Sequence, residues 1–301
     1  MSTVITLSAP AKINLHLAVG GRRHDGFHTI ASIFQAVSLA DTVSVTLLRT
    51  GAIEVVGDCG CAPEQNTVYK AAAAFLADEA LEIIPWGARI EVDKRIPMGA
   101  GLGGGSSDAA ATLKALSALL PGAASSARLL ELAAMIGSDV PFFMGSACAL
   151  VSGRGEILEP LEARQDFVVV IVDPGFPIST REAYAWLDQS RADCTTSSLM
   201  SDYLLDQELG RLAISYAVES PGSWSFRNDF MRPMACLSPG IGACIGRIKA
   251  TGALYAAMSG SGSACFGVYD SEEHAVRALK SLSVQYGSSI AFPLAQLPDS
   301  I

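Results

Sequence analysis

Charged side chains are scarce in this sequence, and acidic ones outnumber basic ones. Only 17% of the 301 residues are Asp, Glu, Lys or Arg, and the formal net charge is −9. A general nucleic-acid binder carries a basic face, so we expect no nucleic-acid partner. A small anionic substrate stays compatible with this charge, because local dipoles and a few cations suffice to bind it.

Long hydrophobic runs are also missing. No stretch of about 18 unbroken apolar residues occurs, so no transmembrane helix is predicted. Residues 1–6 lack the charged start and the apolar core of a secretory signal. We therefore expect a cytoplasmic protein without a membrane partner, and the sequence gives no indication of its oligomeric state.

The seven cysteines lack the spacing of a metal site or of a disulfide framework. Cys59 and Cys61 form the only close pair, with no second pair at zinc spacing and no histidine nearby. We expect free thiols. Half of the residues are hydrophobic, which predicts a substantial core, and the length fits one large domain or two ordinary ones.

The most informative stretch is a glycine-rich loop at residues 97–108. It holds five glycines between Gly99 and Gly105, followed by Ser106 and Ser107. Glycine permits positive φ and close backbone approach, and a helix start presents free N–H groups. A predicted strand precedes the loop and an alanine-rich helix follows it, which is the context of an anion-binding loop. The alternative is a flexible surface linker.

This loop differs from two familiar phosphate-binding loops. Gly99, Gly101 and Gly104 satisfy the G-x-G-x-x-G pattern of dinucleotide folds, but they lie about a third of the way along the chain. This glycine spacing is the only feature of the sequence that would support assignment as a dinucleotide-dependent oxidoreductase. A Walker A loop has Lys directly before its Ser or Thr, where this sequence has Gly105. The cation for a bound phosphate is therefore expected elsewhere in the chain.

Polar residues mark the N-terminal segment. Residues 12–19 alternate with period two, which places Lys12, Asn14 and His16 on one face of a predicted strand. Such a face is either a solvated edge or the wall of a site. The loop at residues 20–28 contains a hairpin-turn signal and several Arg and His residues. It is either a solvated turn or a site for a flat, anionic ligand.

Three further positions have a structural and a functional interpretation. Asp139 is a lone carboxylate between an apolar helix and an apolar run, so it is either a turn residue or a paired group. Asn66 precedes a predicted helix and fits an N-cap. The glycine-rich turn at residues 258–264 is either a hairpin turn or a second anion site.

The predicted elements form two regions. The polar patch at residues 152–160 is the expected joint, giving an N-terminal region of residues 1–155 and a C-terminal region of residues 156–301. We expect a helix at residues 126–136, ended by the glycine that follows it. Residues 190–223 are polar and predict an irregular segment with weak helical character.

Three stretches in this order resemble the GHMP kinases, a family named for galactokinase, homoserine, mevalonate and phosphomevalonate kinases. They are Pro10–Asn14, Pro97–Ser107 and Met258–Ser263. The resemblance implies an α+β fold of two domains: an ATP-binding N-terminal domain like ribosomal protein S5, and a C-terminal ferredoxin-like α/β sandwich. It also implies an ATP-dependent, Mg²⁺-requiring phosphotransferase with an alcohol acceptor.

Two more stretches, Asp25–Thr29 and Gly137–Pro141, narrow this resemblance to one branch of the family. That branch phosphorylates the 2-hydroxyl of a small acceptor carrying a cytidine diphosphate group, in the synthesis of isoprenoid precursors. The alternatives are another GHMP kinase, of the mevalonate or homoserine type, and a non-catalytic ligand-binding relative. The presence of both Lys12 and Asp139 argues against a non-catalytic protein.

The resemblance implies a role for each motif. Lys12 and Asp139 match the catalytic pair, with Asp139 as the base for the acceptor hydroxyl. Mg²⁺ would be carried by ATP and contact Ser106 or Ser107, without a cage of protein ligands. The ATP-binding positions are Asn66, Lys94, Pro97, Met98, Gly99, Ala100, Gly101, Leu102, Gly103, Gly104, Gly105, Ser106 and Ser107. The acceptor-binding positions are Asn14, Phe27, His28, Thr180, Tyr184, Gly260 and Ser261.

Phe27 departs from the family pattern, which has Tyr after Asp-Gly. Phenylalanine keeps the π face but lacks the hydroxyl, so stacking survives and one polar contact is lost. With Tyr184 as the second ring, the resemblance implies a Phe27–Tyr184 sandwich around cytosine, with His28 reading the edge of the base. The alternative is that both rings belong to the core.

Overall fold

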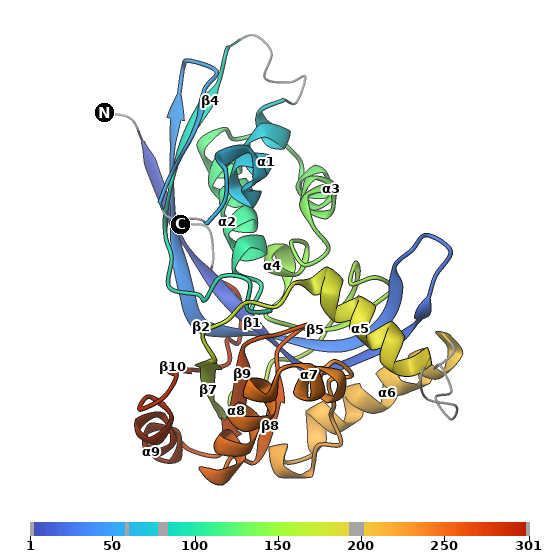
Figure 1. Ribbon diagram of the computed structural model, residues 1–301. Helices are drawn as coiled ribbons and strands as arrows, with labels where there is room; N and C mark the ends of the chain where they lie inside the picture. Colours follow the sequence, from blue (N-terminus) through green and yellow to red (C-terminus); the bar gives the residue numbers. More distant parts are fainter. Residues whose placement is uncertain (1–2, 58–59, 78–83, 193–201, 299–301) are drawn as a thin grey trace.

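The computed structural model describes residues 3–57, 60–77, 84–192 and 202–298, which form two sheets with helices packed on them (Figure 1). No helix in these ranges has both the length and the apolar character needed to cross a membrane. Nor do His, Cys, Asp and Glu side chains in these ranges gather in a group suited to a metal ion. The free thiols in the described ranges are Cys61, Cys148, Cys236, Cys244 and Cys265, whereas Cys59 lies outside them.

Two long strands dominate the first sheet. β1 (Val4–Arg22) and β2 (His28–Leu48) pair antiparallel around the turn at Asp25 and Gly26. Because β2 is long, one part of it pairs with β4 and another part with β5. The strand order is β3-β4-β2-β5-β6, with β1 also on β2. The shorter strands are β3 (Ile53–Val56), β4 (Gly87–Asp93), β5 (Cys148–Ser152) and β6 (Ile157–Pro160).

Helices cover one face of this sheet (Figure 1). α2 (Gly104–Leu119) packs against β1 and β2 through small buried side chains such as Ala109 and Ala110, which let the helix lie close to the strands. The helix expected at residues 126–136 is confirmed and ends at Gly137. The remaining elements of this layer are a 3₁₀ turn (Pro63–Gln65), α1 (Thr67–Leu76), α3 (Ser126–Ile136) and α4 (Phe142–Gly145).

The second sheet is antiparallel, in the order β10-β7-β9-β8. Its strands are β7 (Val168–Asp173), β8 (Tyr255–Met258), β9 (Cys265–Tyr269) and β10 (Gly287–Ala291). α8 (Pro239–Ala250) and α9 (Glu272–Leu282) pack on it. Three further elements are α5 (Thr180–Ala192), a 3₁₀ turn (Pro221–Ser223) and α7 (Met231–Leu237). Figure 1 shows the tip of the β1–β2 hairpin rising beside α5.

One segment differs from its sequence-based expectation. The irregular segment expected at residues 190–223 is wrong where α6 (Asp202–Val218) forms a regular helix. Leu205 packs with Ala18 and Ala31 of the long strands, so tertiary packing stabilises a helix whose own periodicity is weak. Residues 193–201 of the same expectation lie outside the described part of the chain.

The polar patch expected to join the two regions is the turn of a hairpin. β6 pairs with β5, with Ser152 opposite Ile157 and Ala149 opposite Pro160, so pairing within the first sheet continues to Pro160. The second sheet begins with β7 at Val168. The division between residues 155 and 156 stays a prediction.

Candidate active site

A cleft of about 1080 Å³ lies where the first sheet, the glycine-rich loop and α5 meet. Segments far apart in the sequence line it, because the two sheets and their helices converge there. Of the residues singled out by sequence, the lining contains Lys12, Asn14, Phe27, His28, Gly101, Gly103, Asp139, Thr180, Tyr184, Gly260 and Ser261. Folding therefore gathers the candidate catalytic pair, part of the glycine-rich loop and the candidate acceptor-binding residues around one space.

Lys12 is a buried cation in the wall of this cleft. Its side chain is 4% exposed, and its Nζ lies 3.4 Å from Asp139 Oδ2. The same ammonium donates to Asn14 Oδ1 at 2.6 Å and sits 4.4 Å from the centre of the Phe34 ring. Burial lowers the pKa of Lys12, and the attraction of Asp139 opposes that shift. Lys12, Asn14 and His16 are all buried, so this face of β1 is not a solvated edge.

Asp139 presents a carboxylate that is paired on one side and accessible on the other. It follows α3 in the turn after Gly137, and its side chain is 29% exposed while its partner Lys12 is almost fully buried. An ionised, accessible carboxylate within reach of a bound hydroxyl is what a general base requires. The pairing with Lys12 supports the functional interpretation of Asp139 over a plain turn residue.

The glycine-rich loop takes the backbone shape that its composition predicts. Gly99, Gly101 and Gly103 all have positive φ, and Gly103 directly precedes the first residue of α2. A Cβ on Gly103 would lie 3.0 Å from Lys12 Cγ and 3.1 Å from the Phe143 ring. The loop is therefore packed against Lys12 and Phe143, which excludes a flexible surface linker. It leaves the N–H groups at the start of α2 available for an anion.

The two serines of the loop differ in their surroundings. Ser107 is buried, and its Oγ has no hydrogen-bond partner among the described residues. Ser106 is half-buried. An unpartnered buried hydroxyl is costly and rare, and it often marks the place of a missing ligand. Ser107 lines a separate cavity of about 10 Å³ with Pro10 and Lys114 and is not among the residues that line the cleft, so its contact with phosphate or Mg²⁺ stays a prediction.

The glycine-rich turn at residues 258–264 packs against the glycine-rich loop at residues 97–108. Ser259 Oγ donates to Gly101 O at 2.9 Å, and Ala264 N donates to Ala100 O at 3.0 Å. Asn228 stabilises this turn, because its Nδ2 donates hydrogen bonds to the carbonyls of Met258 and Gly260. The segment between β8 and β9 is therefore part of the cleft wall as well as a hairpin turn. Near its tip, the hydroxyls of Ser261 and Thr180 lie 3.0 Å apart.

Three aromatic rings line the other end of the cleft. The structure places the His28 ring, not the Phe27 ring, directly against Tyr184, with centroids 4.9 Å apart and planes inclined by 24°. Phe27 is 55% exposed and lies beneath the Arg154 guanidinium. Both Phe27 and Tyr184 line the cleft, but a Phe27–Tyr184 sandwich around a base stays a prediction. Burial raises the pKa of Tyr184 to about 12, and the nearby Asp139 charge adds to this shift.

Two of the predicted ATP-binding residues, Asn66 and Lys94, have structural partners. Asn66 is the N-cap of α1 and accepts from Val68 N, which confirms its capping role. Lys94 lies between two carboxylates, 2.5 Å from Asp41 Oδ2 and 2.8 Å from Asp108 Oδ2. Lys94 therefore ties β2 to the first turns of α2. Their contacts with ATP stay predictions.

The sequence reasoning missed several residues of this site. Asp188 contacts His28, Asn228 and Ser259 hold the second glycine-rich turn, and Asp41 anchors the segment before the glycine loop. No local pattern singles them out, because their partners lie 30 to 245 positions away. Ser259 alone had a signal, since it lies inside a turn that was already recognised as glycine-rich.

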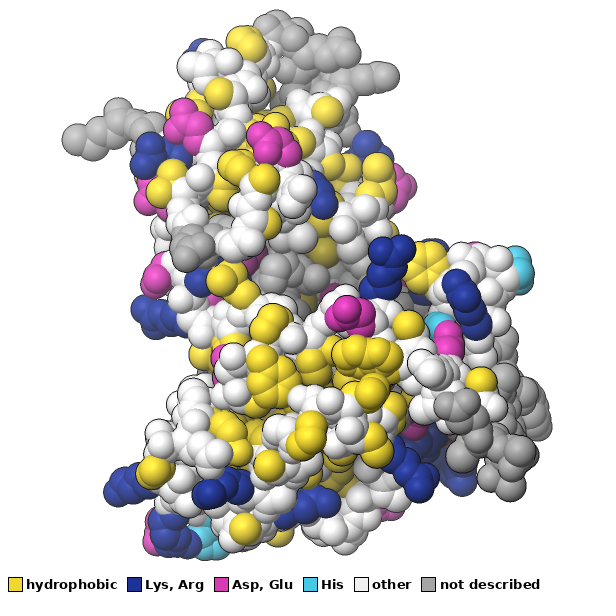
Figure 2. Space-filling model, in the orientation of Figure 1, with side chains coloured by type: hydrophobic (Ala, Val, Ile, Leu, Met, Phe, Trp, Pro, Cys, Tyr) yellow, Lys and Arg dark blue, Asp and Glu magenta, His cyan; other side chains and the backbone are white. Residues whose placement is uncertain are grey.

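A second cavity, of about 1390 Å³, opens on the opposite face of α5. Trp186, Met231 and Leu254 are among its lining residues, and Figure 2 shows hydrophobic side chains gathered where Figure 1 places α5, α7 and α8. Its lining contains no lysine–carboxylate pair like that of Lys12 and Asp139. The smaller cleft is therefore the candidate active site, although its volume is less.

Known proteins resemble the chain over nearly its full length. The family models for the GHMP kinases N terminal domain and the GHMP kinases C terminal match residues 66–146 and 216–287. A 4-diphosphocytidyl-2-C-methyl-D-erythritol kinase of Treponema pallidum (strain Nichols) is 39% identical over 284 residues, which cover 94% of this chain and 96% of that protein.

Solved structures show the same architecture. A crystal structure of 4-(cytidine 5′-diphospho)-2C-methyl-D-erythritol kinase is 34% identical, with a TM-score of 0.76, and covers 95% of this chain and 98% of its own. Homoserine kinase from Cytophaga hutchinsonii is 22% identical, with a TM-score of 0.74, and covers 99% of this chain and 97% of its own. The second likeness concerns the fold alone. These matches confirm the expected α+β fold with two sheets, and the chain belongs to the GHMP kinase family.

Proposed function

We propose that this protein transfers the γ-phosphoryl group of ATP to the 2-hydroxyl of 4-diphosphocytidyl-2-C-methyl-D-erythritol, a step in the synthesis of isoprenoid precursors. The observation that carries the proposal is the Lys12–Asp139 pair, which faces the cleft beside the glycine-rich loop with Nζ and Oδ2 3.4 Å apart. Two relatives that match over nearly the full length, at 34% and 39% identity, are named as kinases of this acceptor.

Asp139 and Lys12 have different roles in phosphoryl transfer to the acceptor. The acceptor hydroxyl loses its proton to Asp139 as its oxygen forms a bond to the γ-phosphorus, and the bond to the bridging oxygen of ADP breaks. The Lys12 ammonium lies beside this carboxylate and offsets negative charge on the transferring group. Because Lys12 is almost fully buried, water screens its charge little.

The start of α2 suits the phosphates of ATP. Backbone N–H groups of the first turn are free of intrahelical partners, and the helix dipole favours negative charge there. The buried Ser107 hydroxyl supports a contact with a phosphate oxygen or with Mg²⁺. When bound, Mg²⁺ neutralises charge on the phosphate oxygens. No protein cage for the ion is needed, in line with its being carried by ATP.

The remaining part of the cleft suits the cytidine diphosphate group of the acceptor. Arg22, Arg154 and Arg181 line it and supply positive charge for the diphosphate. Phe27 and Tyr184 offer π faces for the base, and His28 offers a polar edge. A mevalonate or homoserine acceptor would leave this end of the cleft unused.

A four-acceptor assay tests the proposal. Purified protein is incubated with Mg²⁺, ATP and one of 4-diphosphocytidyl-2-C-methyl-D-erythritol, mevalonate, homoserine or galactose, and ADP release is measured. We expect turnover with the first acceptor and none above background with the others. Efficient turnover of mevalonate or homoserine instead would assign the protein to another branch of the family.

A further inference from the structure

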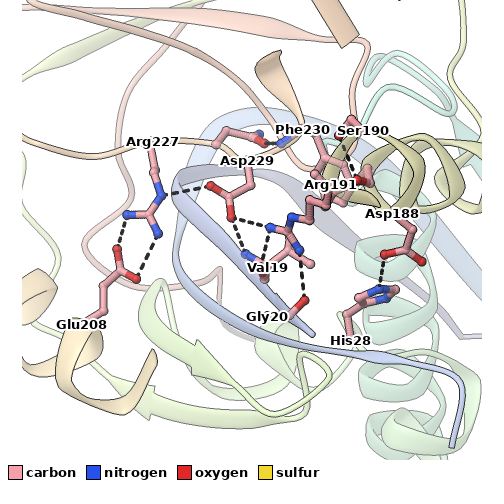
Figure 3. Close-up of polar contacts among 12 residues, drawn as sticks. Val19, Gly20, His28, Asp188, Ser190, Arg191, Glu208, Arg227, Asp229 and Phe230 are labelled. Atoms are coloured by element: carbon pink, nitrogen blue, oxygen red, sulfur yellow. Dashed lines mark hydrogen bonds and ion pairs between the residues drawn. The ribbon is translucent and has the colours of Figure 1, made fainter. Parts of the chain in front are cut away.

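His28 is held by two residues from one face of α5. Its Nε2 lies 2.8 Å from Asp188 Oδ1, and its ring stacks on Tyr184 at a centroid distance of 4.9 Å. Figure 3 shows Asp188 pointing from α5 toward the His28 ring. The His28 side chain is 5% exposed, although it lines the cleft. Its orientation is therefore fixed before any ligand binds.

The spacing of Tyr184 and Asp188 explains how one helix makes both contacts. Residues four positions apart lie one above the other on the same face of a helix. The Tyr184 ring sets the plane of the imidazole, and the Asp188 carboxylate sets the rotation of the ring within that plane. Together these two contacts determine which ring nitrogen of His28 faces Asp188.

The chemistry of the carboxylate then fixes the proton on the ring. An ionised carboxylate only accepts hydrogen bonds, so Nε2 of His28 must be the donor in the contact with Asp188. In a neutral imidazole one nitrogen carries the hydrogen and the other carries the lone pair. In the neutral form of His28, the contact therefore leaves Nδ1 as a hydrogen-bond acceptor.

We propose that Asp188 is a positioning residue that makes His28 select cytosine over uracil. This inference rests on the proposed function, in which His28 faces the base of the acceptor. Cytosine carries an amino group, a donor, where uracil carries a carbonyl oxygen. A lone pair on Nδ1 accepts from the amino group and repels the carbonyl oxygen. The Asp188 carboxylate thus influences base selection by fixing the tautomer of His28, and it does not contact the base itself.

A purely structural role for the Asp188–His28 pair is the competing explanation. The pair also joins α5 to the β1–β2 hairpin, so it could simply hold the two together. However, Arg191 already does so from the same helix, donating to Val19 O at 2.7 Å and to Gly20 O at 3.1 Å (Figure 3). Arg191 also pairs with Asp229 at 3.1 Å. Loss of the Asp188 carboxylate therefore leaves α5 anchored, which makes the two explanations separable.

Two Asp188 variants and one control test the proposal by kinetics. D188A removes the acceptor for Nε2, and D188N can donate to Nε2 and so favour the opposite tautomer. E182Q neutralises an exposed carboxylate in the first turn of the same helix and serves as control. For each protein, kcat and KM are measured with the cytidine acceptor and with its uridine analogue at saturating ATP, and KM for ATP is measured at saturating acceptor. Melting curves establish that each variant is folded.

The expected result is a change in base preference. In the wild type kcat/KM should favour the cytidine acceptor, and D188A should reduce that ratio by about tenfold, the value of one hydrogen bond of roughly 1.4 kcal/mol. D188N should reduce it further by improving the uridine analogue, and E182Q should leave it unchanged. In each case the change should fall on KM of the acceptor, with kcat and KM for ATP retained. An unchanged ratio in both folded Asp188 variants overturns the proposal.

A second measurement examines the tautomer without activity. The ¹⁵N chemical shifts of His28 in the full-length protein should show hydrogen on Nε2 alone in the wild type, and hydrogen on Nδ1 in a substantial fraction of D188N. Hydrogen on Nδ1 in the wild type overturns the proposal. If the wild type shows the expected tautomer but phosphorylates neither acceptor, the proposed function is refuted. The inference then also fails, because there is no base selection for Asp188 to influence. Turnover with an unchanged ratio refutes the inference alone.

Discussion

Ser259 donates a hydrogen bond from Oγ to the carbonyl of Gly101 at 2.9 Å, and this contact joins the two glycine-rich turns. The two residues are 158 positions apart, and they lie on segments that follow different sheets. The approach is so close that a Cβ on Gly101 would lie 2.2 Å from Ser259 O. Glycine at this position therefore serves both the loop shape and the contact between the two parts of the cleft wall.

G101A should disrupt this contact, and G122A provides a matched control. Both glycines have positive φ, but a Cβ on Gly122 meets nothing within 4 Å. G122A should cost only the left-handed strain, about 1–2 kcal/mol. G101A should lower the free energy of unfolding by clearly more, because the Ser259 backbone must move, and it should raise KM for ATP. Denaturant unfolding and steady-state kinetics measure both effects, and equal losses in the two variants would contradict the close approach.

D139N should nearly abolish phosphoryl transfer while the protein stays folded. The amide cannot take the hydroxyl proton, and such a role is typically worth about a hundredfold or more in kcat. The control D93N makes the same change on a carboxylate that is 66% exposed and away from the cleft. D93N should keep normal activity. Near-normal kcat in D139N would show that Asp139 is not the base.

S107A should weaken ATP use without destabilising the fold. Its Oγ is buried without a partner among the described residues. Replacing the hydroxyl by hydrogen therefore removes an uncompensated polar group and should leave the melting temperature unchanged or raise it. If this hydroxyl contacts Mg²⁺ or phosphate, the Mg²⁺ or ATP concentration for half-maximal rate should rise by about tenfold or more. S106A is the matched control and should change both values less. A larger effect in S106A would assign the contact to Ser106.

Stability should depend on pH through Asp108. Burial raises the pKa of Asp108 to about 7, and the adjacent Asp41 adds to the shift while Lys94 opposes it. The folded state therefore holds a proton that the unfolded chain releases near its ordinary pKa of 3.8. Because the folded state binds more protons in this window, the contribution of Asp108 to stability is fully present below pH 3.8 and is lost as the pH rises toward 7.

D108N isolates that contribution. The amide does not titrate, so the free energy of unfolding of D108N relative to the wild type should increase as the pH rises from about 4 to about 7, by at most about 4 kcal/mol. Urea unfolding at several pH values measures this difference. D93N, which alters an exposed carboxylate, should show no such trend. A difference between D108N and wild type that is constant over this range would rule out the raised pKa.

Local features of the site could be read from the sequence. The positive φ of Gly99, Gly101 and Gly103 and the helix that follows depend on neighbouring residues only, so the shape of this loop was predictable. The N-cap at Asn66 was predictable for the same reason. Alternation placed Lys12 and Asn14 on one face of a strand but left open whether solvent or a cleft faces them.

Contacts between distant segments could not be read from it. The sequence identified His28 as a candidate for reading the base, but not Asp188, which is 160 positions away. It did not show that the His28 ring stacks on Tyr184, and the Phe27–Tyr184 sandwich around a base stays a prediction. α6 was missed because its burial depends on the long strands and not on its own periodicity.

By itself, therefore, the sequence determined the motifs, their order and the kinase family they indicate, because turns, helix starts and strand faces follow from residues near one another in the chain. Only the tertiary structure decided that Lys12 and Asp139 meet at 3.4 Å, that Ser259 closes on Gly101, and that α5 holds His28. These relationships depend on how two sheets and their helices pack, and packing is set by the whole buried interior and by no single segment.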